Sequence, residues 1–153
     1  MEIERKFLIN PNDLNRLIFE LQDKCPDSIS DYYFNDYTRL RQINNDYFIT
    51  VKSIGTMERQ EYEYALKEIP IIPGRMLSKV RYYYPYKGHK FEINFYNLYY
   101  HTPFSNDRLI LVEVELNNKD EHVELPDWIG MEVTEDPRFY NRNIFKSFQQ
   151  SLV

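Results

Sequence analysis

The sequence predicts an α+β fold in which an antiparallel sheet of seven or eight strands closes into a barrel. Short segments rich in β-branched and aromatic residues follow one another through most of the chain, with turn residues between them. Helical spacing is confined to one segment near the start and one at the end. Strands so numerous and so closely spaced often close into a barrel. The length of 153 residues fits a single domain, 1–153.

The composition narrows the class of protein. With 42% apolar and 28% charged residues, the chain is typical of a soluble globular domain. The net charge of −5 argues against a general nucleic-acid binder, although it says nothing about a local basic pocket. No apolar run approaches the roughly 20 residues of a membrane span, and the charged start is unlike a signal peptide. Cys25 is the only cysteine, so no internal disulfide can form and we expect a reducing, cytoplasmic location.

The elements follow in order from the opening strand, MEIERKFLI. A helix is predicted over 10–24, with Asn10 or Asn12 as its cap and Pro11 in its first turn. Further strands are predicted at 30–34, 37–43, 47–53, 59–66, 78–86, 89–97 and 109–116. Turns are predicted at 44–46, 55–58, 87–89 and 117–120, and loops at 68–77 and 126–130. The tail, 138–153, returns to helical spacing with Ile144, Phe145, Phe148 and Leu152 as its apolar stripe.

Charge recurs every second residue along these strands, and side chains two apart share a face. The charged or polar positions are Glu2, Glu4, Lys6, Arg39, Arg41, Thr50, Lys52, Arg59, Glu61, Glu63, Lys79, Arg81, Lys90, Glu92, Asn94, Glu113 and Glu115. An ordinary antiparallel sheet with one face in water would explain any one of these strands. Together they fit that explanation less well, because the polar face is almost wholly Glu, Arg and Lys in near balance.

The alternative is that the charged faces line the inside of the barrel, while the helices and the apolar faces form a core outside it. Each desolvated ion costs several kcal/mol unless pairing or a ligand offsets that cost, so such an interior indicates function. Arg and Lys directed at one volume make an anion site, and Arg binds two phosphate oxygens at once. Several Glu in the same volume suit a hard divalent ion such as Mg²⁺ or Mn²⁺. Both together fit a polyphosphate carried with its metal.

These residues resemble the CYTH superfamily, also called triphosphate tunnel metalloenzymes. The family signature ExExK matches at Glu2, Glu4 and Lys6. Further matches follow in the family's order at RLR (39–41), TVK (50–52), RQEYE (59–63), KVRY (79–82), FEINF (91–95), LVEVEL (111–116) and WIGMEVTEDPRFYN (128–141). The resemblance covers essentially the whole chain and is closest to the small prokaryotic members, many of which hydrolyse inorganic tripolyphosphate.

The resemblance implies a closed eight-stranded barrel that forms a tunnel, with helices packed outside. It implies that Mg²⁺ or Mn²⁺ is bound by Glu2, Glu4, Glu92, Asn94, Glu113 and Glu115. It assigns the triphosphate to Lys6, Arg39, Arg41, Lys52, Arg59, Lys79 and Arg81, which with Glu61 and Glu63 form the predicted catalytic set. The C-terminal helix can close one tunnel end in relatives, and Lys146 would then reach the substrate. Small relatives often dimerise, which makes a homodimer an expectation as well.

One position departs from the family pattern. Relatives commonly carry E-x-D-x-F where this chain has EINF, so Asn94 replaces an Asp. Asn keeps an oxygen donor but loses the charge, which either alters metal binding or is tolerated because the position only supports its neighbours.

The predicted function is therefore metal-dependent hydrolysis of a triphosphate, most simply inorganic tripolyphosphate. The alternatives are an adenylate cyclase of the same superfamily, a nucleoside, thiamine or RNA 5′-triphosphatase, and a non-catalytic binder of polyphosphate or nucleotide. The short chain argues against the cyclase, which needs a base and ribose pocket beyond the tunnel. Asn94 is the feature that keeps the binder as an alternative.

Overall fold

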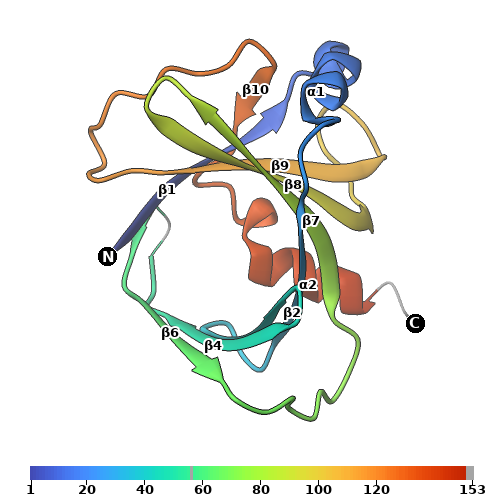
Figure 1. Cartoon of the computed structure of the whole chain (residues 1–153), viewed down its shortest axis with the longest axis vertical. Coiled ribbons are helices and arrows are strands. Elements are labelled where there is room, and N and C mark those ends of the chain that lie inside the picture. The colour runs from blue at the N-terminus through green and yellow to red at the C-terminus, as the bar shows by residue number, and fades with distance from the viewer. Residues whose placement is uncertain (56, 151–153) are drawn as a thin grey trace.

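The computed structural model describes residues 1–55 and 57–150 (Figure 1). Its strands are β1 (Glu2–Ile9), β2 (Asp27–Tyr33), β3 (Thr38–Ile43), β4 (Asp46–Lys52), β5 (Glu58–Arg59), β6 (Glu61–Leu66), β7 (Leu77–Tyr86), β8 (His89–Tyr99), β9 (Arg108–Glu115) and β10 (Ile129–Glu132). Its helices are α1 (Leu14–Leu21) and α2 (Asn141–Gln150), each preceded by one 3₁₀ turn, at Pro11–Asp13 and Pro137–Phe139.

The strands form one antiparallel sheet that curls into a nearly closed barrel, as predicted. Neighbours follow the order β10-β1-β9-β8-β7-β2-β3-β4-β6. The ring returns to its start through β5, which pairs with β1 at Glu2–Arg59 and Ile3–Glu58. Because β5 and β6 are separated only by Gln60, one continuous segment bridges β4 and β1. If β5 and β6 are counted as one, the closed ring therefore has eight strands, and β10 extends the sheet alongside the second half of β1.

Several strand ends are shifted by a few residues, as at β2, which begins at Asp27 instead of residue 30, and the assignment itself differs from prediction in two places. The segment 59–66 is split at Gln60, since its beginning pairs with β1 and its remainder with β4. The predicted loop at 126–130 ends in strand β10, because Ile129 pairs with Ile9 and Glu132 with Phe7. Turns at Asn44 and at Lys87–Gly88 are confirmed by their positive φ angles of 53°, 45° and 87°. Leu152, at the end of the predicted C-terminal helix, lies outside the described residues.

The strand register directs the charged residues into the barrel. Lys6 lies opposite Glu113, and Glu113 lies opposite Glu92 on its other side. Arg81 faces Asn94 across β7 and β8. These side chains alternate with buried apolar residues on the other face, such as Ile93, Val112 and Val114. The interpretation of the charged face as interior is thus confirmed for most of its residues, whereas Glu63 and Lys90 are exposed.

Helix α1 covers part of the outside of the barrel, as predicted. Asn10 caps its leading 3₁₀ turn by accepting a hydrogen bond from the backbone of Asn12. Leu17 and Leu21 are buried against the outward residues of β1, β8 and β9. Trp128, 1% exposed, packs into the same outer core. This helix therefore anchors the strands that carry the N-terminal charges.

Helix α2 lies at one end of the barrel, against inward-facing side chains, and so differs from the prediction that both helices pack outside. Its buried residues Ile144, Phe145 and Phe148 contact a cluster that includes Leu77 and Leu111. Leu77 shares a strand face with Lys79, and Leu111 shares one with Glu113, which places α2 within the outline of the barrel (Figure 1). The helix therefore covers one end of the barrel.

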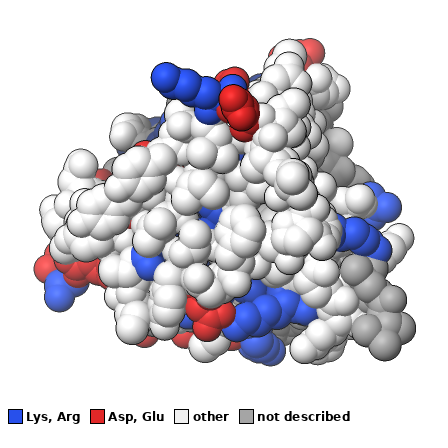
Figure 2. All heavy atoms as spheres, turned by 90° about the horizontal axis from the view of Figure 1, so that it is seen from below, with Lys and Arg blue, Asp and Glu red and all other residues white. Residues whose placement is uncertain are grey.

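The outside of the barrel carries few charges on the face shown in Figure 2, which is mostly neutral with scattered basic and acidic side chains. Tyr62 and Tyr64 of β6 are more than half exposed on the outside. In the described part of the chain, neither helix is long and apolar enough to cross a membrane.

Candidate functional site

The charged faces enclose a cavity of about 320 Å³. Its lining residues come from most staves of the barrel and from the start of α2. They are Glu2, Glu4, Lys6, Tyr33, Asp36, Tyr37, Arg39, Arg41, Thr50, Lys52, Ser53, Arg59, Glu61, Lys79, Arg81, Glu92, Glu113, Glu115, Tyr140, Asn141 and Arg142. All seven basic residues of the predicted catalytic set therefore face one volume. The cavity also gathers five of the six predicted metal ligands.

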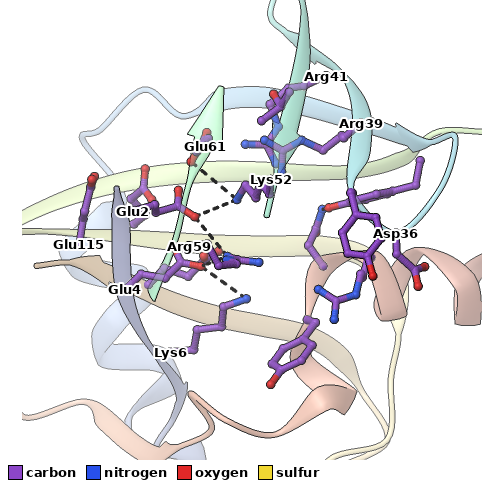
Figure 3. A pocket seen from close by; sticks show the side chains of 18 of the residues that line it. Glu2, Glu4, Lys6, Asp36, Arg39, Arg41, Lys52, Arg59, Glu61 and Glu115 are labelled. Carbon is purple, nitrogen blue, oxygen red and sulfur yellow. Dashed lines mark hydrogen bonds and ion pairs between the residues drawn. The ribbon is translucent and has the colours of Figure 1, made fainter. Parts of the chain in front are cut away.

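The N-terminal strand supplies the first group of ion pairs. Arg59 Nη2 donates to Glu2 Oε1 at 3.2 Å and to Glu4 Oε1 at 3.1 Å, so it lies between the two acids (Figure 3). Lys52 Nζ donates to the same oxygen of Glu2 at 3.0 Å. Lys6 Nζ lies 3.6 Å from Glu4 Oε1. Both acids of the ExExK signature thus already form ion pairs with basic side chains of the protein.

The opposite wall is built by β7, β8 and β9. Arg81 donates from Nε to Asn94 Oδ1 at 2.8 Å and from Nη1 to Glu92 at 3.2 Å. Asn94 is fully buried and donates in turn to Glu113 Oε1 at 3.2 Å and to the Leu111 carbonyl at 3.0 Å. Asn94 does not line the cavity; it sits behind Arg81 and holds it in place. Its amide hydrogens are used by two acceptors, which an Asp could not satisfy in the same way.

A third group centres on Asp31, which the sequence analysis missed. Asp31 is 1% exposed and forms a bidentate pair with Arg41, at 2.7 Å to Nε and 2.8 Å to Nη2. Arg39 Nε lies 3.9 Å away from the same carboxylate. The sequence did contain an indication of this role, because Asp31 shares a strand face with Ile29 and Tyr33, and this strand precedes RLR (39–41). A single acid among aromatic residues was too weak a pattern to be noticed.

Several pKa values are shifted by burial and by the neighbouring charges. Burial, together with the charge of Glu113, raises the pKa of Glu4 to about 7. Burial would also raise the pKa of Glu113, but Lys6, Lys79 and Arg81 bring it well below its usual range. The two carboxyl groups interact directly, so near neutral pH the pair shares at most one proton.

The pKa values of Lys79 and Asp31 are also shifted by burial and by the neighbouring charges. Burial, with the positive charges of Arg81 and Arg41, lowers the pKa of Lys79 well below its usual value. Burial would raise the pKa of Asp31, but Arg41 and then Arg39 and Lys79 more than reverse this and hold it well below its usual range. On this side of the cavity, Arg41, Arg39 and Lys79 therefore surround one fixed carboxylate, that of Asp31.

Three buried polar atoms along the cavity have no hydrogen-bond partner among the described residues. They are Arg39 Nε, Thr50 Oγ1 and Arg59 Nε. Arg39 and Thr50 lie directly opposite each other on β3 and β4. A buried polar group without a partner costs about 1–3 kcal/mol, so such atoms point to an acceptor that fills the cavity. Thr50 had been placed on the polar face without a role.

Besides Asn94, two predicted site residues are not brought to the cavity. Glu63 of β6 is exposed and is absent from the lining. Lys146 of α2 lies outside as well, with its side chain 54% exposed and paired with Asp36 at 2.5 Å. The helical period located Lys146 on α2 but could not give the direction of its side chain. Asn141, which was not among the predicted site residues, lines the cavity beside Tyr140 and Arg142.

The acids of the cavity have the donor chemistry of a hard divalent ion but are not gathered into a finished metal site. No group of three or more His, Cys, Asp or Glu close enough for a metal occurs in residues 1–55 and 57–150. Two pairs of carboxyl groups do interact directly, Glu4 with Glu113 and Glu2 with Glu61. A pair that shares a proton is a position at which a divalent ion can replace that proton.

Comparison with known proteins agrees with this geometry. An inorganic triphosphatase from Acetivibrio thermocellus is 30% identical over 95% of this chain and 94% of its own length. An inorganic triphosphatase from Nitrosomonas europaea is 37% identical over 68% of this chain and 71% of its own. A crystal structure of an inorganic triphosphatase superposes with a TM-score of 0.58 at 31% identity, covering 94% of this chain and 93% of the other. The family model for the CYTH domain matches residues 1–140. This chain therefore belongs to the CYTH domain family.

Proposed function

We propose that this protein hydrolyses inorganic tripolyphosphate in the charged tunnel, with Mg²⁺ or Mn²⁺ as its cofactor. The observation that carries the proposal is the convergence of seven Lys and Arg side chains from different strands on one cavity of about 320 Å³. Three buried polar atoms in that cavity have no protein partner among the described residues, and an anionic oxygen would satisfy each of them. The two relatives named inorganic triphosphatase support the same substrate class.

The residues of the chain divide into those that hold phosphate and those that suit the metal. Arg41, Arg39 and Lys79 lie around Asp31 on one side, and Arg59, Lys52 and Lys6 lie around Glu2 and Glu4 on the other. Arg81 lies between Glu92 and Glu113. Because Arg41, Lys79 and Arg81 are held by hydrogen bonds before substrate enters, these three cations can stabilise the charge that develops on the phosphates without reorganising.

The metal would be held by Glu2, Glu4, Glu113 and Glu115, with Glu92 nearby. A bound divalent ion would neutralise part of the phosphate charge and polarise a phosphoryl group. The acids themselves would exchange partners, since Arg59 and Lys52 now occupy Glu2 and would turn to the phosphates instead. Glu4, whose pKa is raised to about 7, would release its proton when the ion binds.

The test is phosphate release by the purified protein, with Mg²⁺ or Mn²⁺, from tripolyphosphate, ATP, GTP and thiamine triphosphate. We expect tripolyphosphate to give the highest kcat/KM. Release from no substrate would overturn the proposal, and cyclic AMP formed from ATP would establish the cyclase alternative. Tight triphosphate binding without turnover would establish the binder.

Two neighbouring basic residues of β1, one facing the cavity and one facing outward, test whether the cavity is the site of hydrolysis. Lys6 faces the cavity, whereas Arg5 faces outward and pairs with Glu132. A charge-assisted hydrogen bond contributes about 1.5–3 kcal/mol, so Lys6→Met should lower kcat/KM by roughly 10- to 100-fold. Arg5→Met should stay within about threefold of the wild type, because its exposed pair contributes about 0–1 kcal/mol. Equal losses in both variants would contradict the tunnel as the site.

A further inference from the structure

Asn141, the first residue of α2, makes three side-chain hydrogen bonds across the inside of the barrel. Its Nδ2 donates to Asp31 Oδ2 at 3.0 Å and to the Tyr33 hydroxyl at 2.6 Å. Its Oδ1 accepts from the Tyr96 hydroxyl at 2.8 Å. The orientation of the amide is fixed by its neighbours, because the reverse orientation would direct its oxygen at the Asp31 carboxylate. One side chain thus connects the start of α2 to β2 and β8.

Two of these partners, Asp31 and Tyr96, each hold a cation that faces the cavity. Asp31 binds Arg41 through both carboxylate oxygens, and the oxygen that receives Asn141 also receives Arg41 Nη2. Tyr96 gives its only hydroxyl hydrogen to Asn141, so its lone pairs are left for Lys79 Nζ, 3.3 Å away. Tyr96 is 2% exposed, so no alternative partner from bulk water competes.

We propose that Asn141 is a positioning residue for triphosphate hydrolysis, which orients Arg41 through Asp31 and Lys79 through Tyr96. The inference rests on the proposed function. It adds to that function the residue that aligns two of the phosphate-binding cations. Because Asn141 belongs to α2, the helix that covers one end of the barrel is also the element that fixes these two side chains. A displacement of α2 would release both cations at once.

A purely structural role for Asn141, in which it only fastens α2 to the sheet, makes different predictions. The same helix offers a matched control in Asn143, whose Nδ2 donates to the Pro137 carbonyl at 2.8 Å, away from the cavity. Asn143→Ala and Asn141→Ala remove the same group two positions apart. Asn141→Asp keeps the shape of the side chain but removes the donor that faces Asp31.

The first measurement is steady-state hydrolysis of tripolyphosphate with Mg²⁺. Loss of buried hydrogen bonds costs about 1–3 kcal/mol, so Asn141→Ala should lower kcat/KM by roughly 5- to 150-fold, with Asn141→Asp at least as damaging. Asn143→Ala should stay within about twofold. In a Tyr96→Phe background, Asn141→Ala should cost less than in the wild type, because part of its effect passes through Tyr96. Full additivity of the two substitutions, or a mild Asn141→Asp, would overturn the inference.

The second measurement does not need activity. Solvent exchange of the Arg41 Nε–H proton, followed by ¹H–¹⁵N NMR, reports directly on the bond to Asp31. We expect Asn141→Ala to accelerate this exchange at least tenfold and Asn143→Ala to leave it unchanged; unchanged exchange in Asn141→Ala would overturn the inference. If the wild type releases no phosphate, the proposed function fails while this arm still decides whether Asn141 orients Arg41. If the wild type is active and both Asn variants behave alike in both measurements, only the inference fails.

Discussion

Replacing Asp31 by Asn tests the electrostatic account of the barrel interior most directly. Asp31 is 1% exposed, lies 2.7 Å and 2.8 Å from two nitrogens of Arg41, and has Arg39 at 3.9 Å. The substitution keeps the shape of the side chain and removes the one buried negative charge of this cluster. Breaking a buried ion pair from one side typically costs about 3–5 kcal/mol, because the remaining charge stays desolvated.

That cost is large for a domain of this size. Small domains are stable by only about 5–15 kcal/mol, and 1 kcal/mol shifts Tm by about 2–4 °C at this length. Asp31→Asn should therefore lower Tm by roughly 6–20 °C, measured by thermal and urea unfolding of metal-free protein at pH 7. The pKa of Asp31 is lowered in the folded state, so its contribution is present above the usual Asp range and is lost as pH falls below about 4.

Glu132→Gln provides the matched control. Glu132 forms a bidentate pair with Arg5 of similar geometry, at 3.0 Å and 2.6 Å, but on the outside of the barrel, where the two side chains are 24% and 40% exposed. Exposed pairs contribute about 0–1 kcal/mol, so Tm should fall by no more than about 4 °C. If Asp31→Asn destabilised the protein no more than Glu132→Gln, the argument that the interior charges are desolvated would be refuted.

Three further predictions concern the cavity. In metal-free protein, the free energy of unfolding should decline by up to about 3 kcal/mol between pH 4.5 and 7, because folded Glu4, with its pKa raised to about 7, keeps a proton that the unfolded chain releases. Glu4→Gln should abolish this decline, measured by urea unfolding at pH 5 and 8. An unchanged decline in the variant would contradict the assignment of the effect to Glu4. Asn94→Asp places an acceptor against Glu113, so without metal it should lower the free energy of unfolding by about 1–3 kcal/mol, and added Mn²⁺ should recover this loss. Equal gains in Tm from Mn²⁺ in the variant and the wild type would speak against an acid at position 94 as a metal ligand. Lys146→Ala should change KM for tripolyphosphate by less than about twofold, since Lys146 does not line the cavity and its pair with Asp36 is exposed. A tenfold rise would restore Lys146 to the binding set.

The barrel and the direction of its charges were predictable because they follow from a period of two. Charge at every second residue of strand after strand required a shared interior, whichever strands were neighbours. The division of 59–66 between two partners was not predictable, because pairing depends on where the ring closes. The helical period of 138–153 located the apolar stripe of α2 but not the surface that receives it, which includes the inward leucines Leu77 and Leu111.

The site was predictable in its residue types but not in its pairings. The sequence placed Glu2 and Glu4 with a metal and Arg59 with phosphate, whereas the structure joins these three side chains to one another. Such partners depend on side-chain reach across the barrel, which strand alternation does not describe. Asp31 and Asn141 were missed for the same reason, because each acts through residues that lie far from it in the sequence.

The position of β1 in the ring has a consequence for how the chain folds. Glu4 of β1 pairs with Glu115 of β9, and Phe7 with Glu132 of β10, each more than a hundred residues later. Contacts of such long sequence separation slow folding, because the chain must close a large loop before they form. Because β1 precedes β9 and β10 in the chain, it is therefore among the last of the described strands to reach its partners, and until then its glutamates are exposed. During synthesis on the ribosome, the strands from β2 to β8 can pair with their neighbours while both ends of the ring remain open.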